Sequence, residues 1–129
     1  MREHSIQNAI RNALAGQCLL FRANVGQAWT GDATRLPNGD VLLRNARPFS
    51  TGLPPGFADT FGLVAVTITP DMVGQVFGRF IAGEVKTATG RVSPKQAAFL
   101  RAVNDNGGTA GVWRSPEDAL AMLAKAKGE

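Results

Sequence analysis

Apolar side chains near the start of the chain recur at helical spacing. Ile6, Ile10 and Leu14 stand four residues apart, and this spacing predicts a helix over residues 3–15 with one buried face. The apolar run at residues 18–22 that follows predicts a short strand. The chain is therefore expected to open with a helix packed beside a strand.

A loose region follows, rich in Gly, Pro, Asn and Asp from residue 24 to residue 55. Within it, the sequence Pro-Asn-Gly-Asp at 37–40 is typical of a tight turn, and the sequence Val-Leu-Leu-Arg at 41–44 predicts one arm of a small hairpin. We expect residues 27–55 to form a variable loop and hairpin insertion within a single domain that spans residues 1–129.

Two longer strands are predicted at residues 59–68 and 76–86. Both are apolar on both faces, as a central strand covered on each side would be. The segment 70–74 between them contains Pro, Asp and Gly, which favour a turn. We therefore expect the two strands to pair antiparallel about Asp71 and Met72.

The C-terminal third contains two marked helix starts. Ser93 as N-cap, Pro94 at the first helical position and then Gln96 predict a helix to about Val103. Residues 109–114 read as a short strand, and a second Ser-Pro start at residue 115 predicts a last helix to about residue 125. The order is helix, strand, hairpin, two strands, helix, strand, helix, which indicates an α/β fold with helices packed on a mixed sheet.

Composition limits the classes of protein to consider. The chain has 129 residues, of which 44% are apolar, enough for the core of one ordinary domain and unlike a disordered or collagenous chain. Its single cysteine, Cys18, excludes a disulfide framework within the chain and a zinc cluster, and we expect it in the core. Without a signal peptide or an apolar stretch of about 20 residues, we expect a soluble protein with no membrane contact.

The charge balance favours a polyanionic partner. Fourteen Lys and Arg residues against ten Asp and Glu give a formal net charge of +4, and the isoelectric point is near 10.0. The basic residues are mostly scattered, so this excess alone indicates a class of partner and no more.

Candidate chemistry gathers at Glu84 and Lys86. Residues two apart on a strand share a face, ~6.6 Å apart along it, and the expected hairpin sets Asp59 opposite Glu84. Two carboxylates facing each other need a cation between them, and a divalent metal held by oxygen ligands would serve. The alternatives are a surface ion pair for Glu84 and Lys86, and a turn-initiating role for Asp59.

Other polar residues extend this picture. Glu3 continues the apolar stripe of the first helix and is a third acid for the metal site, although a first-turn acid also complements the helix dipole. Gln96 has an alternative role as the partner of Ser93 in a capping box. The only histidine, His4, lies off that stripe and is expected to be exposed, which leaves no catalytic triad.

These residues occur in an order shared with a known family. The elements concerned are Glu3, Arg22-Ala23-Asn24-Val25-Gly26, Gly56-Phe57-Ala58-Asp59, Glu84-Val85-Lys86 and Gln96. Over about residues 3–122 the chain resembles the VRR-NUC (virus-type replication-repair) nucleases of the PD-(D/E)xK superfamily, whose stand-alone members are typical of phages and prophages. It departs from them at Ala58, where the superfamily name implies Pro, and in residues 27–55. The resemblance implies a restriction-endonuclease-like core, a mixed β-sheet flanked by helices.

The resemblance also implies roles for individual residues. Asp59, Glu84 and the backbone carbonyl of Val85 would bind Mg²⁺ or Mn²⁺, and Glu3 would complete the metal site directly or through water. Lys86 would position the attacking water and offset charge in the transition state. Gln96 would orient Lys86 or a metal-bound water, so that the expected catalytic residues are Glu3, Asp59, Glu84, Lys86 and Gln96.

The activity implied is metal-dependent hydrolysis of DNA phosphodiesters. The substrate expected first is a four-way (Holliday) junction cut by a homodimer, in the cytoplasm of a bacterium or a phage-infected host. A flap-directed or other replication and repair nuclease, or a non-catalytic DNA-binding module, are the alternatives. The expected DNA contacts are Arg22, Asn24, Arg91 and Lys95, with Arg11, Arg44, Arg47 and Arg101 also available. Trp29 and Trp113 are expected in packing or a dimer contact rather than on bases.

Overall fold

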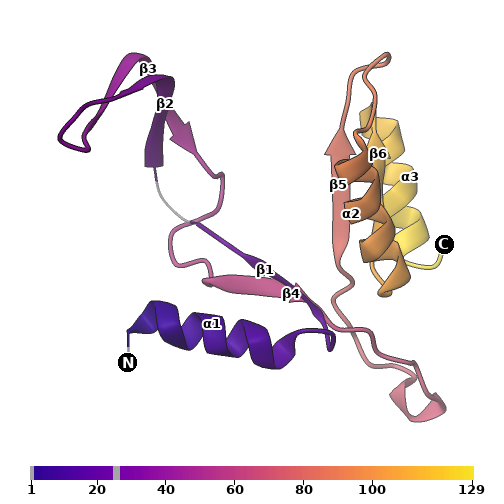
Figure 1. The fold of residues 1–129 in the computed structure, drawn as a ribbon. Helices are drawn as coiled ribbons and strands as arrows, with labels where there is room; N and C mark the ends of the chain where they lie inside the picture. The colour runs from indigo at the N-terminus through magenta and orange to yellow at the C-terminus, as the bar shows by residue number, and fades with distance from the viewer. Residues whose placement is uncertain (1, 25–26) are drawn as a thin grey trace. The chain divides into compact units, whose positions relative to one another are not determined.

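The computed structural model describes residues 2–24 and 27–129. Over these residues the chain is a mixed α/β protein with three α-helices and three two-stranded sheets (Figure 1). Val25 and Gly26, which belong to one of the expected family elements, lie outside the described residues. No helix in the described part is long and apolar enough to cross a membrane.

The expected order of elements is confirmed. The elements are α1 (Glu3–Leu14), β1 (Leu19–Arg22), β2 (Gln27–Arg35), β3 (Val41–Ser50), β4 (Thr60–Leu63), the short 3-10 helix η1 (Pro70–Met72), β5 (Ile81–Val85), α2 (Pro94–Asp105), β6 (Thr109–Trp113) and α3 (Pro116–Ala126). They form two compact units, one of residues 1–20 with 62–129 and one of residues 21–61. The insertion expected at residues 27–55 lies within the second unit.

The second unit is built on the hairpin of β2 and β3. The turn expected at residues 37–40 joins them, and it is closed by a hydrogen bond of 2.7 Å from the Leu36 N–H to the Asp40 carbonyl. Gly39 has φ +92° there, a conformation open to glycine at no steric cost. Both strands extend well beyond the arm predicted at residues 41–44. Their pairing runs from Arg35 with Val41 beside the turn to Gln27 with Ser50 at the far end.

Three phenylalanines pack together in the same unit. The ring centroids of Phe21 and Phe61 are 5.5 Å apart, and those of Phe57 and Phe61 are 5.4 Å apart with the rings edge-on. These distances are typical of favourable aromatic pairs. The cluster brings the end of β1 beside the start of β4, which pair in one small sheet.

The expected pairing of residues 59–68 with 76–86 is wrong. β4 pairs with β1, whereas β5 pairs with β6 in parallel, with Ile81 opposite Thr109 and Val85 opposite Trp113. Only residues 60–63 and 81–85 of the two predicted strands are extended in sheets. The helix α2 lies between β5 and β6 in the chain and provides the crossover connection that parallel neighbours require.

The β5–β6 pair carries a helix on each face. The Trp113 side chain lies over Gly83, where a Cβ atom would overlap its ring, and its indole N–H donates to the Met122 sulfur of α3 at 3.2 Å. Glu84 faces the other way and contacts Gln96 of α2. Trp113 is thus a packing residue, as expected, and α2 and α3 cover opposite faces.

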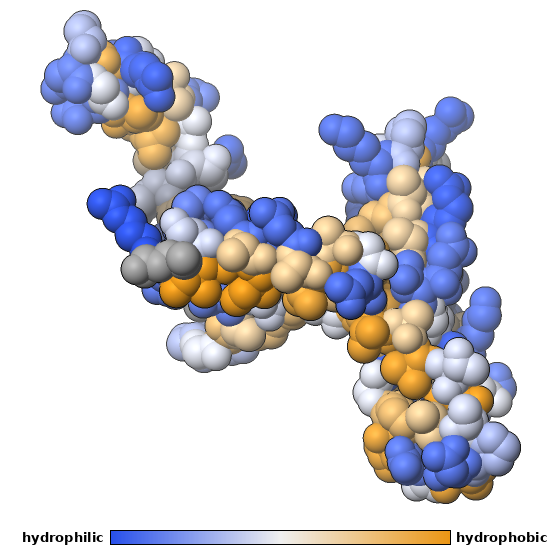
Figure 2. All heavy atoms as spheres, turned by 60° about the horizontal axis from the view of Figure 1, so that its bottom comes forward, coloured by the Kyte–Doolittle hydropathy of each residue, from blue (hydrophilic) through white to orange (hydrophobic). Residues whose placement is uncertain are grey.

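Apolar residues expected in the core are largely exposed. Among the described residues only Val103 has an apolar side chain that is fully buried. The α1 stripe of Ile6, Ile10 and Leu14 is 36–47% exposed and forms an apolar band along the helix in Figure 2. Cys18 is half-buried beside α1 in a hollow of about 570 Å³. The predicted burial of these residues is therefore not found, because the described residues do not cover the stripe.

Candidate functional site

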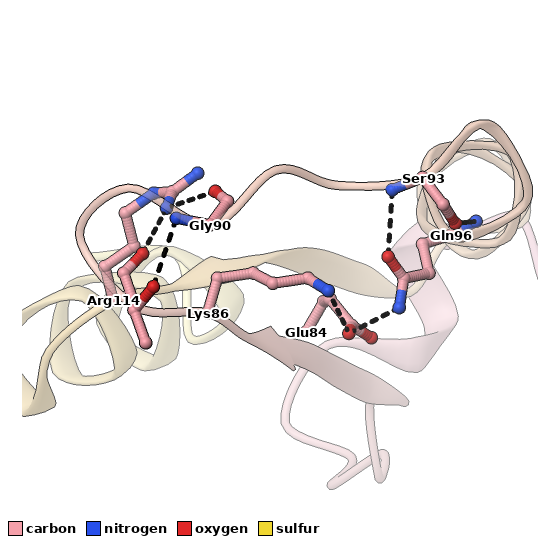
Figure 3. A network of polar contacts seen from close by, with 7 residues as sticks. Glu84, Lys86, Gly90, Ser93, Gln96 and Arg114 are labelled. Atoms are coloured by element: carbon pink, nitrogen blue, oxygen red, sulfur yellow. Dashed lines mark hydrogen bonds and ion pairs between the residues drawn. The ribbon is translucent and has the colours of Figure 1, made fainter.

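The carboxylate of Glu84 lies beside the ammonium group of Lys86 near the end of β5. Lys86 Nζ is 3.5 Å from Glu84 Oε1, and the two side chains are 22% and 31% exposed, respectively. The expected shared face is therefore confirmed (Figure 3). Partial burial keeps both groups accessible to a ligand while reducing the solvent screening between them.

Gln96 joins this pair to the start of α2. Its Oε1 accepts a hydrogen bond of 2.9 Å from the Ser93 backbone N–H, and its backbone N–H donates to Ser93 Oγ at 3.1 Å, which completes the expected capping box. Its Nε2 donates to Glu84 Oε1 at 2.8 Å (Figure 3). A flipped amide would set oxygen against the carboxylate and NH₂ against an N–H, so these two partners fix its orientation.

Both contacts of Glu84 meet at the same oxygen. Lys86 and Gln96 each approach Oε1, and no described residue gives a hydrogen bond or ion pair to Oε2. A carboxylate oxygen has lone pairs available beyond those already used. Glu84 is thus oriented through one oxygen and presents the other to a ligand.

The backbone carbonyl of Val85 points to the open edge of β5. The Lys86 N–H donates to the Trp113 carbonyl at 3.1 Å, so the polar backbone groups of Lys86 face β6. Successive residues of a strand direct these groups to opposite sides, which turns the Val85 carbonyl away from β6. Within the described residues, no strand pairs with that edge.

Arg114 holds the turn that follows Lys86. Its Nη1 donates to the carbonyls of Thr87 at 2.5 Å and Gly90 at 2.7 Å, and the Gly90 N–H donates back to Thr87 Oγ1 at 3.1 Å (Figure 3). The sequence reasoning missed this residue. A prediction that β5 pairs in parallel with β6 would have identified it. Trp113 is opposite Val85 in that pairing, so the next residue, Arg114, comes beside Lys86.

The other two expected acids are exposed. Glu3 is the first residue of α1, and its side chain has no polar partner among the described residues. Asp59 belongs to the second unit, where its backbone carbonyl accepts a hydrogen bond of 2.9 Å from the Ala23 N–H. His4 is exposed as expected and contacts Asn8 at 3.3 Å.

The expected DNA contacts lie on the surface of both units. Arg22 and Asn24 are exposed in the second unit. Arg91 and Lys95 are exposed on either side of Ser93, the N-cap of α2. Both cations flank Ser93, whose capping partner Gln96 contacts the Glu84 carboxylate.

The donors fit a hard divalent cation in part. Oε2 of Glu84 and the outward carbonyl of Val85 belong to consecutive residues of β5, and both are oxygen donors of the kind that Mg²⁺ prefers. The part of the chain that the structure describes contains no group of three or more His, Cys, Asp or Glu side chains gathered to hold a metal. Glu84, Lys86 and Gln96 are the site residues that the structure brings together.

The comparisons with known proteins add no relative to this picture. No family model, no curated protein and no solved structure matches the chain.

Proposed function

We propose that the protein is a metal-dependent DNA nuclease, which hydrolyses phosphodiester bonds. We further propose that it is a VRR-NUC nuclease with a restriction-endonuclease-like core, as its ordered motifs suggest. The observation that carries the proposal is the state of Glu84. One oxygen is fixed by Lys86 and Gln96, and the other has no partner among the described residues.

This arrangement supports hydrolysis better than simple binding. A site that only binds DNA gains nothing from a partly buried carboxylate, because that charge repels phosphate. A carboxylate becomes useful beside phosphate when a cation lies between the two. Mg²⁺ or Mn²⁺ bound here would polarise a phosphoryl oxygen and make water a better nucleophile.

Each residue of the site has a distinct task in this proposal. Glu84 and the Val85 carbonyl would hold the cation, with Asp59 and Glu3 as the further acids that complete its shell. The Lys86 ammonium would orient the attacking water and offset the charge that develops on the phosphate. Gln96 would keep Glu84 Oε1 engaged, so that Oε2 stays directed at the cation.

We propose branched DNA, in particular a four-way junction, as the substrate, cut by a homodimer. Two strands of a junction must be cut symmetrically, and two-fold related sites in two copies of one short chain provide that symmetry. The excess of positive charge, +4 overall, supports a partner with a phosphate backbone.

Cleavage of end-labelled DNA tests the proposal. Junction, flap, nicked and duplex substrates of one sequence are incubated with Mg²⁺ or Mn²⁺ and wild-type, Glu84→Gln or Lys86→Met protein. We expect the wild type to cleave the junction fastest and both variants to lose at least about a hundredfold in rate. Glu117→Gln, a change at an exposed acid of α3, is the matched control and should cleave normally.

Two outcomes would overturn the proposal. Cleavage by Glu84→Gln at the wild-type rate would show that the carboxylate is not part of the active site. Tight binding of the junction without cleavage under either metal would identify the protein as a DNA-binding module.

A further inference from the structure

The hairpin of β2 and β3 contains a bulge that changes which way its arginines point. Thr30 pairs with Arg47 and Asp32 pairs with Arg44, so two steps along β2 correspond to three along β3. Asn45 lies in the longer stretch with φ 54°, as an extra bulge residue does. Three residues apart on a regular strand, Arg44 and Arg47 would lie on opposite faces.

The bulge brings both arginines to one face. Residues directly opposite each other on paired strands share a face, so Arg47 lies with Thr30 and Arg44 with Asp32. Thr30 and Asp32 are two apart on β2 and share that face in turn. We call the face that carries these four residues the arginine face of the hairpin.

The geometry at the bulge is specific to its residues. A Cβ atom at Gly31 would lie 2.8 Å from the Arg44 carbonyl oxygen, so only glycine allows the strands to come this close. Asn45 adopts the left-handed conformation, which Asn tolerates better than most residues, and its Nδ2 donates to Asp32 Oδ2 at 3.0 Å. Sequence and backbone thus agree on the bulge.

The two faces of the hairpin differ in burial. Only Gly31 and Leu43 are less than fully exposed in β2 and β3, and both lie on the face opposite the arginines. Trp29 and Val41 share that opposite face, whereas Leu42 and Phe49 lie on the same face as the arginines. Thr30, Asp32, Arg44 and Arg47 are all exposed, so the arginine face is open to a ligand.

The positive charge of the arginine face is available. Beyond the backbone pairing of β2 with β3, the guanidinium groups of Arg44 and Arg47 make no hydrogen bond or ion pair with another described residue. The one acid on this face, Asp32, accepts instead from Asn45. The Thr30 hydroxyl adds a donor of the kind that contacts phosphate oxygens.

We propose that the arginine face binds the phosphate backbone of DNA, with the two-stranded hairpin lying along a groove. The major groove of duplex DNA admits a two-stranded β-ribbon, and arginine pairs well with phosphate. The inference rests on the proposed function for the choice of DNA as ligand. It adds a binding surface separate from the chemistry at Glu84.

Binding without cleavage tests this surface. Fluorescence anisotropy of a labelled duplex and a labelled four-way junction, in EDTA, gives Kd as a function of salt. We expect Arg44→Gln/Arg47→Gln to weaken binding at least about tenfold and to reduce the slope of log K against log salt by about 1.8. Arg44→Lys/Arg47→Lys, which keeps the charge, should retain most of the affinity.

Arg35→Gln is the matched control, because Arg35 pairs with Val41 on the opposite face of the same hairpin. It should bind DNA as the wild type does. Wild-type affinity in the double glutamine variant, or an equal loss in Arg35→Gln, would overturn the inference. Circular dichroism and thermal melting confirm that each variant is folded. If only the hairpin inference fails, Glu84→Gln still abolishes cleavage.

Discussion

The Gln96 side chain donates to Glu84 Oε1 at 2.8 Å through the same amide whose oxygen caps α2 at the Ser93 N–H. A residue that stabilises a helix start therefore also sets the orientation of a site carboxylate. The expected capping box is confirmed and the same side chain also contacts Glu84, whereas the expected role of Gln96 in orienting Lys86 or a metal-bound water stays a prediction. Variants that remove one role and keep the other separate them.

Gln96→Glu is the first such variant. Glutamate forms the same capping box with Ser93, so we expect the midpoint of thermal unfolding to change little. Its carboxylate would oppose that of Glu84 instead of donating to it, so we expect cleavage to fall at least about tenfold. Ser93→Ala is the complementary variant, because it loses the cap, about 1 kcal/mol of stability, and keeps the Gln96 side chain. Equal activity in the two would contradict the prediction.

Gly83 and Gly111 are opposite each other on β5 and β6 but differ in surroundings. A methyl group at Gly83 would overlap the Trp113 ring, whereas one at Gly111 would lie 3.5 Å from the Met122 sulfur, an ordinary contact. We expect Gly83→Ala to destabilise the fold by about 1–3 kcal/mol and Gly111→Ala to have less effect. Urea unfolding of the two variants checks this, and the reverse order would disprove the packing described.

Removing the Arg114 guanidinium should loosen the turn after Lys86. Its Nη1 holds two carbonyls of that turn, and since the side chain is exposed we expect Arg114→Ala to cost only about 1 kcal/mol. Hydrogen exchange measures the effect locally, through faster exchange at the Gly90 amide. Unchanged exchange there would mean that the turn holds without Arg114. The exposed Arg101 provides a control in Arg101→Ala.

Metal binding gives a test that does not depend on activity. Titration of Mn²⁺, followed by the electron paramagnetic resonance of the free ion, measures its affinity for the protein. We expect Glu84→Gln to lower that affinity at least about tenfold, because a charged oxygen ligand is lost. Glu117→Gln should leave it unchanged. Equal affinity in wild type and Glu84→Gln would place the metal elsewhere.

Local features of the fold and of the site followed from the sequence. The Ser93 capping box depends on residues three apart, and the shared face of Glu84 and Lys86 depends on strand alternation alone. The tight turn at residues 37–40 likewise carried its own signal in Asn and Gly. Each of these is decided within one turn or one strand, and each was predicted correctly.

Strand pairing could not be predicted in the same way. Proximity in the chain favoured an antiparallel partner for β5 from before residue 70, whereas the partner is β6, reached across α2. The choice of partner for β5 depends on how side chains pack on both faces of the sheet, such as Trp113 on Gly83. A local sequence pattern does not contain this information. The same error concealed Arg114 and was the basis for setting Asp59 opposite Glu84, a relationship that the observed pairing removes.

The parallel pairing of β5 and β6 has a consequence for folding. Glu84, Lys86, Gln96 and Arg114 come from one stretch of chain, and the side-chain contacts that these four residues make span at most 27 residues, from Arg114 to Thr87. Contacts that are close in sequence cost little loop-closure entropy and form early. We therefore expect the cluster of Glu84, Lys86 and Gln96 to assemble before contacts that lie further apart in the sequence.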